Sequence, residues 1–307
     1  MSSQPFIVNR KAKVGLFGKS KPIQPKELSI VDFSTNQQQH LIEYDDWEAS
    51  SLSPDGKRII IEKPTIYRGT SKKEISVIDY QANQVLYNTS SYYVFDTAFN
   101  TSGDKLLIVA SKKKPFCYDL TSQQIVAELP HQIRLYEGDL DIHTDIFIAP
   151  VERLKGTCCV FDFKTGQTDT ITVDTKARIS NVKFSPDLSC IYAIANNNIL
   201  YCFDRSYKMI WKKDFTYLGK KGGEINASDI FSSEDGKLLC LSASATETNP
   251  WGADYVVDSS SGEIIRQIEG YHLRGRIKSN YFGNQVLLAT LTTLDLSTGL
   301  VSDEPIL

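Results

Sequence analysis

Histidine, the side chain most often used for acid–base catalysis and zinc binding, occurs four times in this chain of 307 residues. The four are His40, His131, His143 and His272, and no two of them have the H-x-H or H-x-x-x-H spacing that brings two imidazoles to one metal ion. A metal site could be assembled from distant residues, but no repeated column of histidines would build it. We therefore predict no metal site and no catalytic histidine.

The nucleophile and phosphate-binding motifs are also incomplete. Gly18-Lys19-Ser20 resembles the end of a P-loop, but Lys13 stands where that motif needs glycine, and PIQPKE follows where it needs a helix. No serine lies in a G-x-S-x-G elbow, and the six cysteines contain no C-x-x-C pair. We expect reduced cysteines, no cofactor, no catalytic residue and no enzymatic activity.

Seven short apolar runs, each ending in an aspartate, are the main repeated feature. Two residues before each aspartate stands a small or β-branched residue, such as Val77, Cys117 or Cys202, as is typical of a buried strand. Each carboxylate lies beside a turn, where it can accept backbone hydrogen bonds, so we expect a structural role for all seven. The aspartates are Asp32, Asp79, Asp119, Asp162, Asp204, Asp258 and Asp295, which are 37 to 54 residues apart. That spacing brackets the roughly 40–45 residues of a four-stranded propeller blade.

Turn signals flank these runs on both sides. Four residues after the aspartate, most units hold Gly or Asn, which tolerate the positive φ of a tight turn. Upstream, Ser53-Pro54-Asp55-Gly56 precedes another apolar run, and residues 101–104, 185–187 and 233–236 repeat that pattern. Each unit therefore reads as strand A, turn, strand B, variable loop, strand C ending in aspartate, turn and strand D.

These features resemble the WD-repeat and YVTN-repeat-like β-propellers over nearly the whole chain, although no Trp precedes the aspartates and no Gly-His dipeptide opens a blade. The resemblance implies an all-β fold, a seven-bladed β-propeller of four-stranded antiparallel blades, as a single domain over residues 1–307. We expect the ring to close, because an open propeller would leave an unpaired edge. The expected blades are residues 1–47, 48–90, 91–133, 134–175, 176–216, 217–270 and 271–307.

In this topology the B–C and D–A loops emerge on one face, which is richer in aromatic and basic residues than the face formed by the turns. Because Tyr, Trp and Arg dominate interface hot spots, we predict a non-catalytic protein–protein interaction module. Its loop face would bind an acidic protein surface, as a complex subunit or as a dedicated inhibitor of an effector or toxin. The loops are 62–74, 111–115, 150–156 and 243–254 (B–C), and 214–224 and 270–276 (D–A). The predicted partner-binding residues are Tyr67, Arg68, Tyr92, Tyr93, Arg134, Tyr136, Tyr217, Trp251, Tyr271, Arg274 and Arg276.

The alternative function is a propeller hydrolase of the lactonase type, with carboxylate, His or Arg groups converging on a central channel. Nucleic-acid binding ranks lower, because the basic loops 111–115 and 214–224 belong to different blades and the net charge is −3.

No run approaches the roughly 18 apolar residues of a transmembrane helix, and the N-terminus lacks the apolar region of a secretory signal. We expect a cytoplasmic protein without membrane contact that is monomeric by itself.

Overall fold

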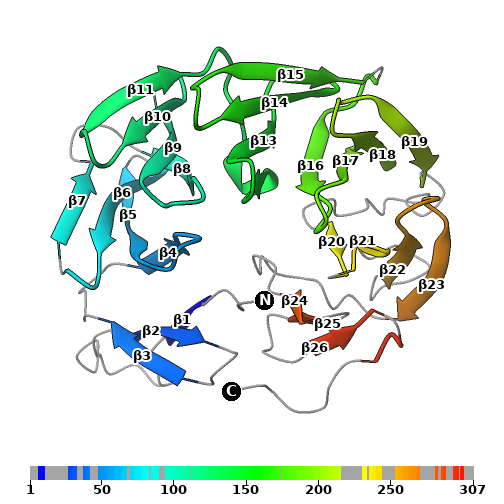
Figure 1. Ribbon diagram of the computed structural model, residues 1–307, viewed down its shortest axis with the longest axis horizontal. Helices are drawn as coiled ribbons and strands as arrows, with labels where there is room; N and C mark the ends of the chain where they lie inside the picture. Colours follow the sequence, from blue (N-terminus) through cyan, green and yellow to red (C-terminus); the bar gives the residue numbers. More distant parts are fainter. Residues whose placement is uncertain are drawn as a thin grey trace. The chain divides into compact units, whose positions relative to one another are not determined.

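The computed structural model describes an all-β protein (Figure 1). The chain divides into two compact units, Met1–Pro130 and His131–Leu307, and each is described by itself. In strands β1–β3 and in residues 48–50, 63–67 and 70–73 only the backbone is described. The described residues are 6–10, 27–32, 37–41, 48–67, 70–82, 84–89, 94–111, 113–173, 175–215, 230–233, 235–243, 253–269, 281–282, 285–287, 293–296 and 298–300.

The first unit contains a three-stranded antiparallel sheet and a larger sheet made of two meanders. A single residue pair, Lys73 of β6 with Val94 of β8, joins the two meanders. The strands are β1 Phe6–Arg10, β2 Glu27–Asp32, β3 Gln37–Leu41, β4 Glu48–Leu52, β5 Arg58–Tyr67, β6 Thr70–Asp79, β7 Gln84–Asn88, β8 Val94–Phe99, β9 Lys105–Ala110, β10 Phe116–Asp119 and β11 Gln124–Glu128.

The second unit repeats the four-stranded antiparallel meander three times, as β12–β15, β16–β19 and β20–β23, and the described part of β24–β26 forms a three-stranded sheet. The repeated meander is the blade unit of a propeller-like fold. The elements are the 3₁₀ turn η1 Leu135–Glu137, β12 Asp139–Asp141, β13 Ile146–Pro150, β14 Thr157–Asp162, β15 Thr168–Thr172, β16 Ile179–Phe184, β17 Cys190–Ala195, β18 Ile199–Asp204, β19 Met209–Asp214, β20 Phe231–Ser232, β21 Leu238–Ala243, β22 Ala253–Asp258, β23 Ile264–Glu269, β24 Tyr281–Phe282, β25 Gln285–Leu287 and β26 Thr293–Asp295.

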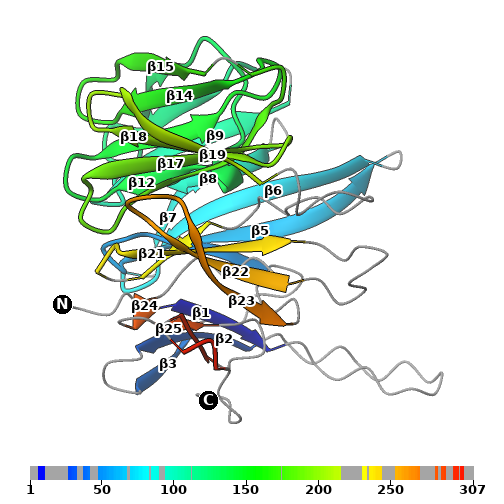
Figure 2. The same ribbon diagram turned by 90° about the vertical axis from the view of Figure 1, so that its right-hand side faces the viewer.

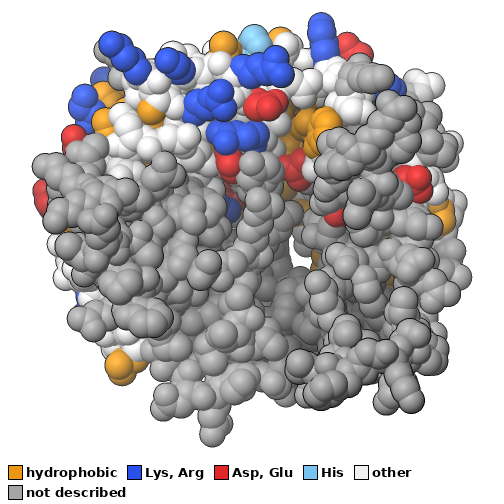
Figure 3. Space-filling model, turned by 180° about the vertical axis from the view of Figure 1, so that it is seen from behind, with side chains coloured by type: hydrophobic (Ala, Val, Ile, Leu, Met, Phe, Trp, Pro, Cys, Tyr) orange, Lys and Arg blue, Asp and Glu red, His pale blue; other side chains and the backbone are white. Residues whose placement is uncertain are grey.

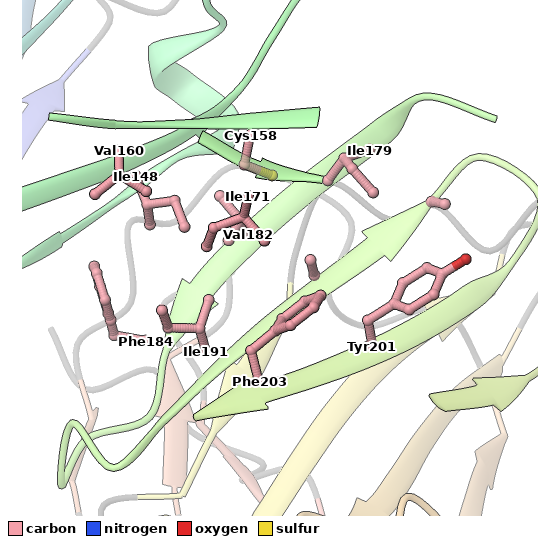
Figure 4. Packing of buried hydrophobic residues seen from close by; sticks show 12 residues of the cluster. Ile148, Cys158, Val160, Ile171, Ile179, Val182, Phe184, Ile191, Tyr201 and Phe203 are labelled. Carbon is pink, nitrogen blue, oxygen red and sulfur yellow. The ribbon is translucent and has the colours of Figure 1, made fainter. Parts of the chain in front are cut away.

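Side chains from neighbouring sheets pack face to face in the second unit. Figure 4 shows one such layer, in which Ile148 and Cys158 from one sheet lie against Val182, Ile191 and Phe203 from the next. The middle strands of β16–β19 and β20–β23 are apolar on both faces because another sheet of the same unit packs on each side of them. The outermost strands β15 and β19 consist mostly of exposed residues instead.

Strand C is buried as the sequence predicts. Val77, Cys117, Val160, Cys202 and Val256, each two residues before the strand-end aspartate, are all at most 5% exposed. All six cysteines of the chain are free thiols.

Six of the seven strand-end aspartates have the predicted structural role. Asp119, for example, accepts hydrogen bonds from the backbone nitrogens of Thr121 at 2.9 Å and Ser122 at 2.8 Å. The equivalent contacts bind the turn after each of the others, Asp79, Asp162, Asp204, Asp258 and Asp295. The side chain of Asp32 lies outside the described residues.

The A–B turns share one hydrogen-bonding pattern. The Ser53 hydroxyl donates to Asp55 Oδ1 at 2.6 Å and accepts from the backbone nitrogen of Arg58 at 2.9 Å. Ser185 and Ser233 repeat both bonds with the same two distances. A residue of positive φ completes each turn.

The predicted B–C loop 62–74 was wrong. Strands β5 and β6 continue as a hairpin of ten residues each, paired up to Tyr67 and Thr70 (Figure 2). The segment looks like a loop because it contains Pro64 and three Lys residues, which are depleted in strands. The pairing shows that backbone bonds along the hairpin outweigh that preference.

Candidate protein-interaction surface

Most of the predicted partner-binding residues lie outside the described residues, namely Arg68, Tyr92, Tyr93, Tyr217, Trp251, Tyr271, Arg274 and Arg276. Tyr67 ends β5, and Tyr136 lies in the 3₁₀ turn η1, but only the backbone of each is described. Their part in partner binding stays a prediction. Arg134 has a described side chain.

Arg134 makes contacts within the second unit. Its Nη1 donates to Glu137 Oε1 at 3.0 Å, and its Nη2 donates to the backbone carbonyl of Ile179. The side chains of Arg134 and Glu137 are only 18% and 11% exposed. These bonds connect η1, which precedes β12, to the first residue of β16 in the next sheet. The guanidinium therefore positions two neighbouring sheets.

Four exposed cations lie on two loops of the second unit, and we call them the basic loop surface: Arg153, Lys155, Lys176 and Arg178. Loop 150–156 belongs to the loops predicted to be functional, whereas the loop after β15 was not among them. In Figure 3, Lys and Arg side chains gather in the upper part of the view, with some Asp and Glu side chains between them.

Backbone hydrogen bonds hold the two loops of this surface together. Gly156 donates its amide to the carbonyl of Ala177 at 2.9 Å and accepts from the amide of Val173 at 2.8 Å. Arg178 in turn accepts from the amide of Asn196 at 2.8 Å. The bond between Gly156 and Ala177 therefore joins the backbone next to Lys155 to the backbone between Lys176 and Arg178.

Gly156 fits this junction because it lacks a side chain. Its φ is +60°, and an added Cβ would lie 2.3 Å from the Val173 carbonyl oxygen and 2.9 Å from Thr175 Cγ2. Glycine is the residue that adopts positive φ without a steric penalty. The close approach of the two loops thus depends on this position.

The cations of the basic loop surface make no ion pair with a described residue. Two acidic side chains are near them in sequence: Glu152 is half-buried, and Asp174 lies outside the described residues. Between Arg153 and Lys155, Leu154 is 41% exposed. The surface thus combines positive charge with an apolar side chain, and it can attract carboxylates.

A second charged cluster is buried between two sheets of the same unit. The side chain of Asp141 is fully buried and accepts hydrogen bonds from Thr144, from the backbone nitrogen of His143 at 2.9 Å, and from Arg205. Burial by itself would raise the pKa of Asp141, but the bonds from Thr144, His143 and Arg205 hold that pKa below its ordinary value. A carboxylate held ionised in this way joins β12 to the turn after β18 and cannot act as a general acid near neutral pH.

Asp139, two residues earlier, links the same two sheets. It accepts from the backbone nitrogen of Phe184 at 2.9 Å and lies 3.4 Å from Lys183 Nζ. The Arg205 guanidinium also lies over the Phe184 ring, 5.0 Å from its centre. The sequence motifs did not reveal these residues, because the A–B turn of this sheet lacks the Ser-Pro-Asp-Gly pattern. We interpret this cluster as structural.

No known family model matches the chain, and no curated protein matches it. Among the described residues, no three His, Cys, Asp or Glu side chains lie close enough together to hold a metal ion. The described part also holds no helix with the length and apolarity needed to cross a bilayer.

Proposed function

We propose that this chain is a seven-bladed β-propeller and a non-catalytic protein-interaction module. Its loop face binds a protein partner with an acidic surface. The repeated four-stranded meanders support the propeller, since their strand-end aspartates recur at blade spacing along the whole chain. The main support for the function is the basic loop surface, whose four exposed cations make no ion pair with described residues.

The charged side chains of the described residues also divide by role in a way that supports binding. Strand-end aspartates and the Asp141 cluster stabilise turns and sheet contacts. The cations of loops 152–156 and 175–178 make no such contact. Exposed charges on a rigid scaffold attract a complementary surface and increase the rate of encounter with it.

The first test is purification of the tagged protein from its native cells at low and at high salt, followed by mass measurement of what comes with it. We expect a stoichiometric protein partner whose retention is weakened by salt. A chain that purifies alone at both salt concentrations contradicts the proposal. In that case, metal analysis and a lactone-hydrolysis assay of the same sample test the hydrolase alternative.

The placement of the contact is tested by changing Trp251, Arg274 and Arg276 together to Ala. These residues lie in loops 243–254 and 270–276, and we expect the triple variant to lose the partner. Circular dichroism and the melting temperature must match those of the natural chain. Capture that persists in a folded triple variant contradicts this placement.

A further inference from the structure

We propose that the basic loop surface, Arg153, Lys155, Lys176 and Arg178, is an anchor for an acidic segment of the protein partner. This inference rests on the proposed function and assigns its charge recognition to four residues that the sequence analysis did not select. The ligand groups are the carboxylates of Asp and Glu side chains.

The anchor is organised before any partner arrives. Two backbone hydrogen bonds through Gly156 fix loop 152–156 against loop 173–178, and the amide of Asn196 binds the carbonyl of Arg178. A partner therefore does not have to order these loops on binding, which lowers the entropic cost of association. The long side chains remain free to adjust to the spacing of the carboxylates.

The side-chain types favour carboxylates. Two guanidinium groups can each bind a carboxylate with two parallel hydrogen bonds, and two ammonium groups add charge without fixed geometry. Because Arg153, Lys155, Lys176 and Arg178 make no ion pair with a described residue, the partner displaces no internal carboxylate from them. Each contact gains a charge-assisted bond without breaking one in the described part of the chain.

A protein segment fits better than a nucleic acid. Segments 152–156 and 175–178 contain no aromatic residue on which a base could stack. Leu154, exposed between two of the cations, offers the apolar contact found at the centre of protein interfaces. The net charge of −3 also repels a polyanion at long range, whereas a short acidic segment meets mainly the local charge.

The test compares the natural chain with the loop variant R153Q/K155Q/K176Q/R178Q. The control variant K164Q/K208Q/K212Q/K237Q loses the same charge at four exposed positions in other elements of the second unit. The probes are a fluorescein-labelled oligoglutamate peptide, the oligoglutamine peptide of equal length, and single-stranded oligothymidylate. Fluorescence anisotropy is measured at low and moderate salt.

We expect the natural chain to bind oligoglutamate in a salt-dependent way and not to bind oligoglutamine. Affinity should fall about tenfold or more in the loop variant, since four screened charge contacts together contribute at least that factor. In the control variant it should change less than about threefold. Both variants should melt within about 2 °C of the natural chain, because all eight positions are exposed and the ion pair that the control variant loses, Lys237 with Asp235, lies at the surface.

Three outcomes overturn the anchor: no binding of oligoglutamate, equal losses in both variants, or tighter binding of oligothymidylate than of oligoglutamate. The captured partner separates this failure from that of the proposed function. A loop variant that retains the partner with full affinity removes the anchor and leaves the interaction module standing. Failure to capture any protein contradicts the module itself.

Discussion

At the scale of single residues, Gly156 and Gly236 both have positive φ, of +60° and +70°, but differ in the space around them. We predict that Gly156→Ala lowers the free energy of unfolding by about 3 kcal/mol, from backbone strain plus a clash with the Val173 carbonyl. Gly236→Ala should cost only about 1 kcal/mol, since the nearest atom to its Cβ would be 3.7 Å away. Urea denaturation of both variants measures the difference.

Equal losses in the two glycine variants would contradict the close approach at Gly156. Gly156→Ala should also weaken the binding of oligoglutamate if the two loops separate. Gly236 lies in an A–B turn, away from loops 152–156 and 173–178 in sequence, so its variant should bind normally.

Arg134 supports a second prediction at this scale. Replacement of Arg134 by Ala removes the cation that pairs with Glu137, whose side chain is only 11% exposed, and the donor to the Ile179 carbonyl. We therefore expect the free energy of unfolding to fall by about 2 kcal/mol. Arg153→Ala, at an exposed position without such contacts, should change stability by less than about 0.5 kcal/mol. Thermal and urea unfolding measure both values. A fully stable Arg134→Ala protein would show that this guanidinium is not structural.

At the scale of elements, the A–B turn is a module in which Ser and Asn are alternatives. Asn100 takes the serine position in one turn, where its Nδ2 donates to Asp104 at 2.7 Å and its Oδ1 accepts from the Lys105 amide at 2.9 Å. Ser233 is fully buried in the same role and accepts from the Leu238 amide.

We predict that Ser233→Ala costs about 1–2 kcal/mol, because the partly buried Leu238 amide loses its side-chain acceptor. Ser233→Asn should recover at least half of that loss by making the bonds that Asn100 makes. Equilibrium unfolding of the two variants is the measurement. An Asn variant no more stable than the Ala variant would show that the turns are not interchangeable.

Much of the architecture could be predicted from the sequence at this scale. Strands B, C and D follow from short apolar runs and from turn residues whose hydrogen bonds are local, such as Ser185 with Asp187. The paired extension of β5 and β6 could not be predicted, because Pro64 and its lysines favour a loop and the strand pairing depends on tertiary context.

The candidate site was harder to predict. Arg134 was selected for its residue type, which does not reveal that Glu137 and Ile179 already occupy it. Of the basic loop surface, loop 150–156 was among the loops predicted to be functional, but its partner loop was missed because Lys155 and Lys176 lie in separate loops that the bonds of Gly156 bring together. The sequence contains the charges, but their proximity is a property of the fold.

At the scale of the whole molecule, several aspartates make the stability of the fold depend on pH in the acidic range. Hydrogen bonds from Ser185, Ser233 and Ser260 lower the pKa of Asp187, Asp235 and Asp258 respectively, and Asp141 is lowered despite its burial. An aspartate whose pKa is lower in the folded state stabilises the fold at pH values above its unfolded pKa of about 3.9. This stabilisation is lost as the pH falls through the folded-state pKa.

We therefore expect a melting temperature nearly independent of pH between about 6 and 8, and a fall that begins below about pH 5. Asp187→Asn should lower stability at neutral pH and make the acid slope shallower. Differential scanning fluorimetry over this pH range is the measurement. A melting temperature that rises on acidification would contradict the role given to these carboxylates.

The burial of strands B and C has a further consequence, because it places thiols at separate points along the chain. Cys117 lies in β10, Cys158 and Cys159 in β14, Cys202 in β18, and Cys240 in β21. Burial raises the pKa of Cys158 and of Cys159 to about 12, so these thiols react only when their sheet opens. Timed alkylation followed by peptide mass analysis would record the order in which the sheets open. The natural chain thus carries its own reporters of local unfolding, without an added label.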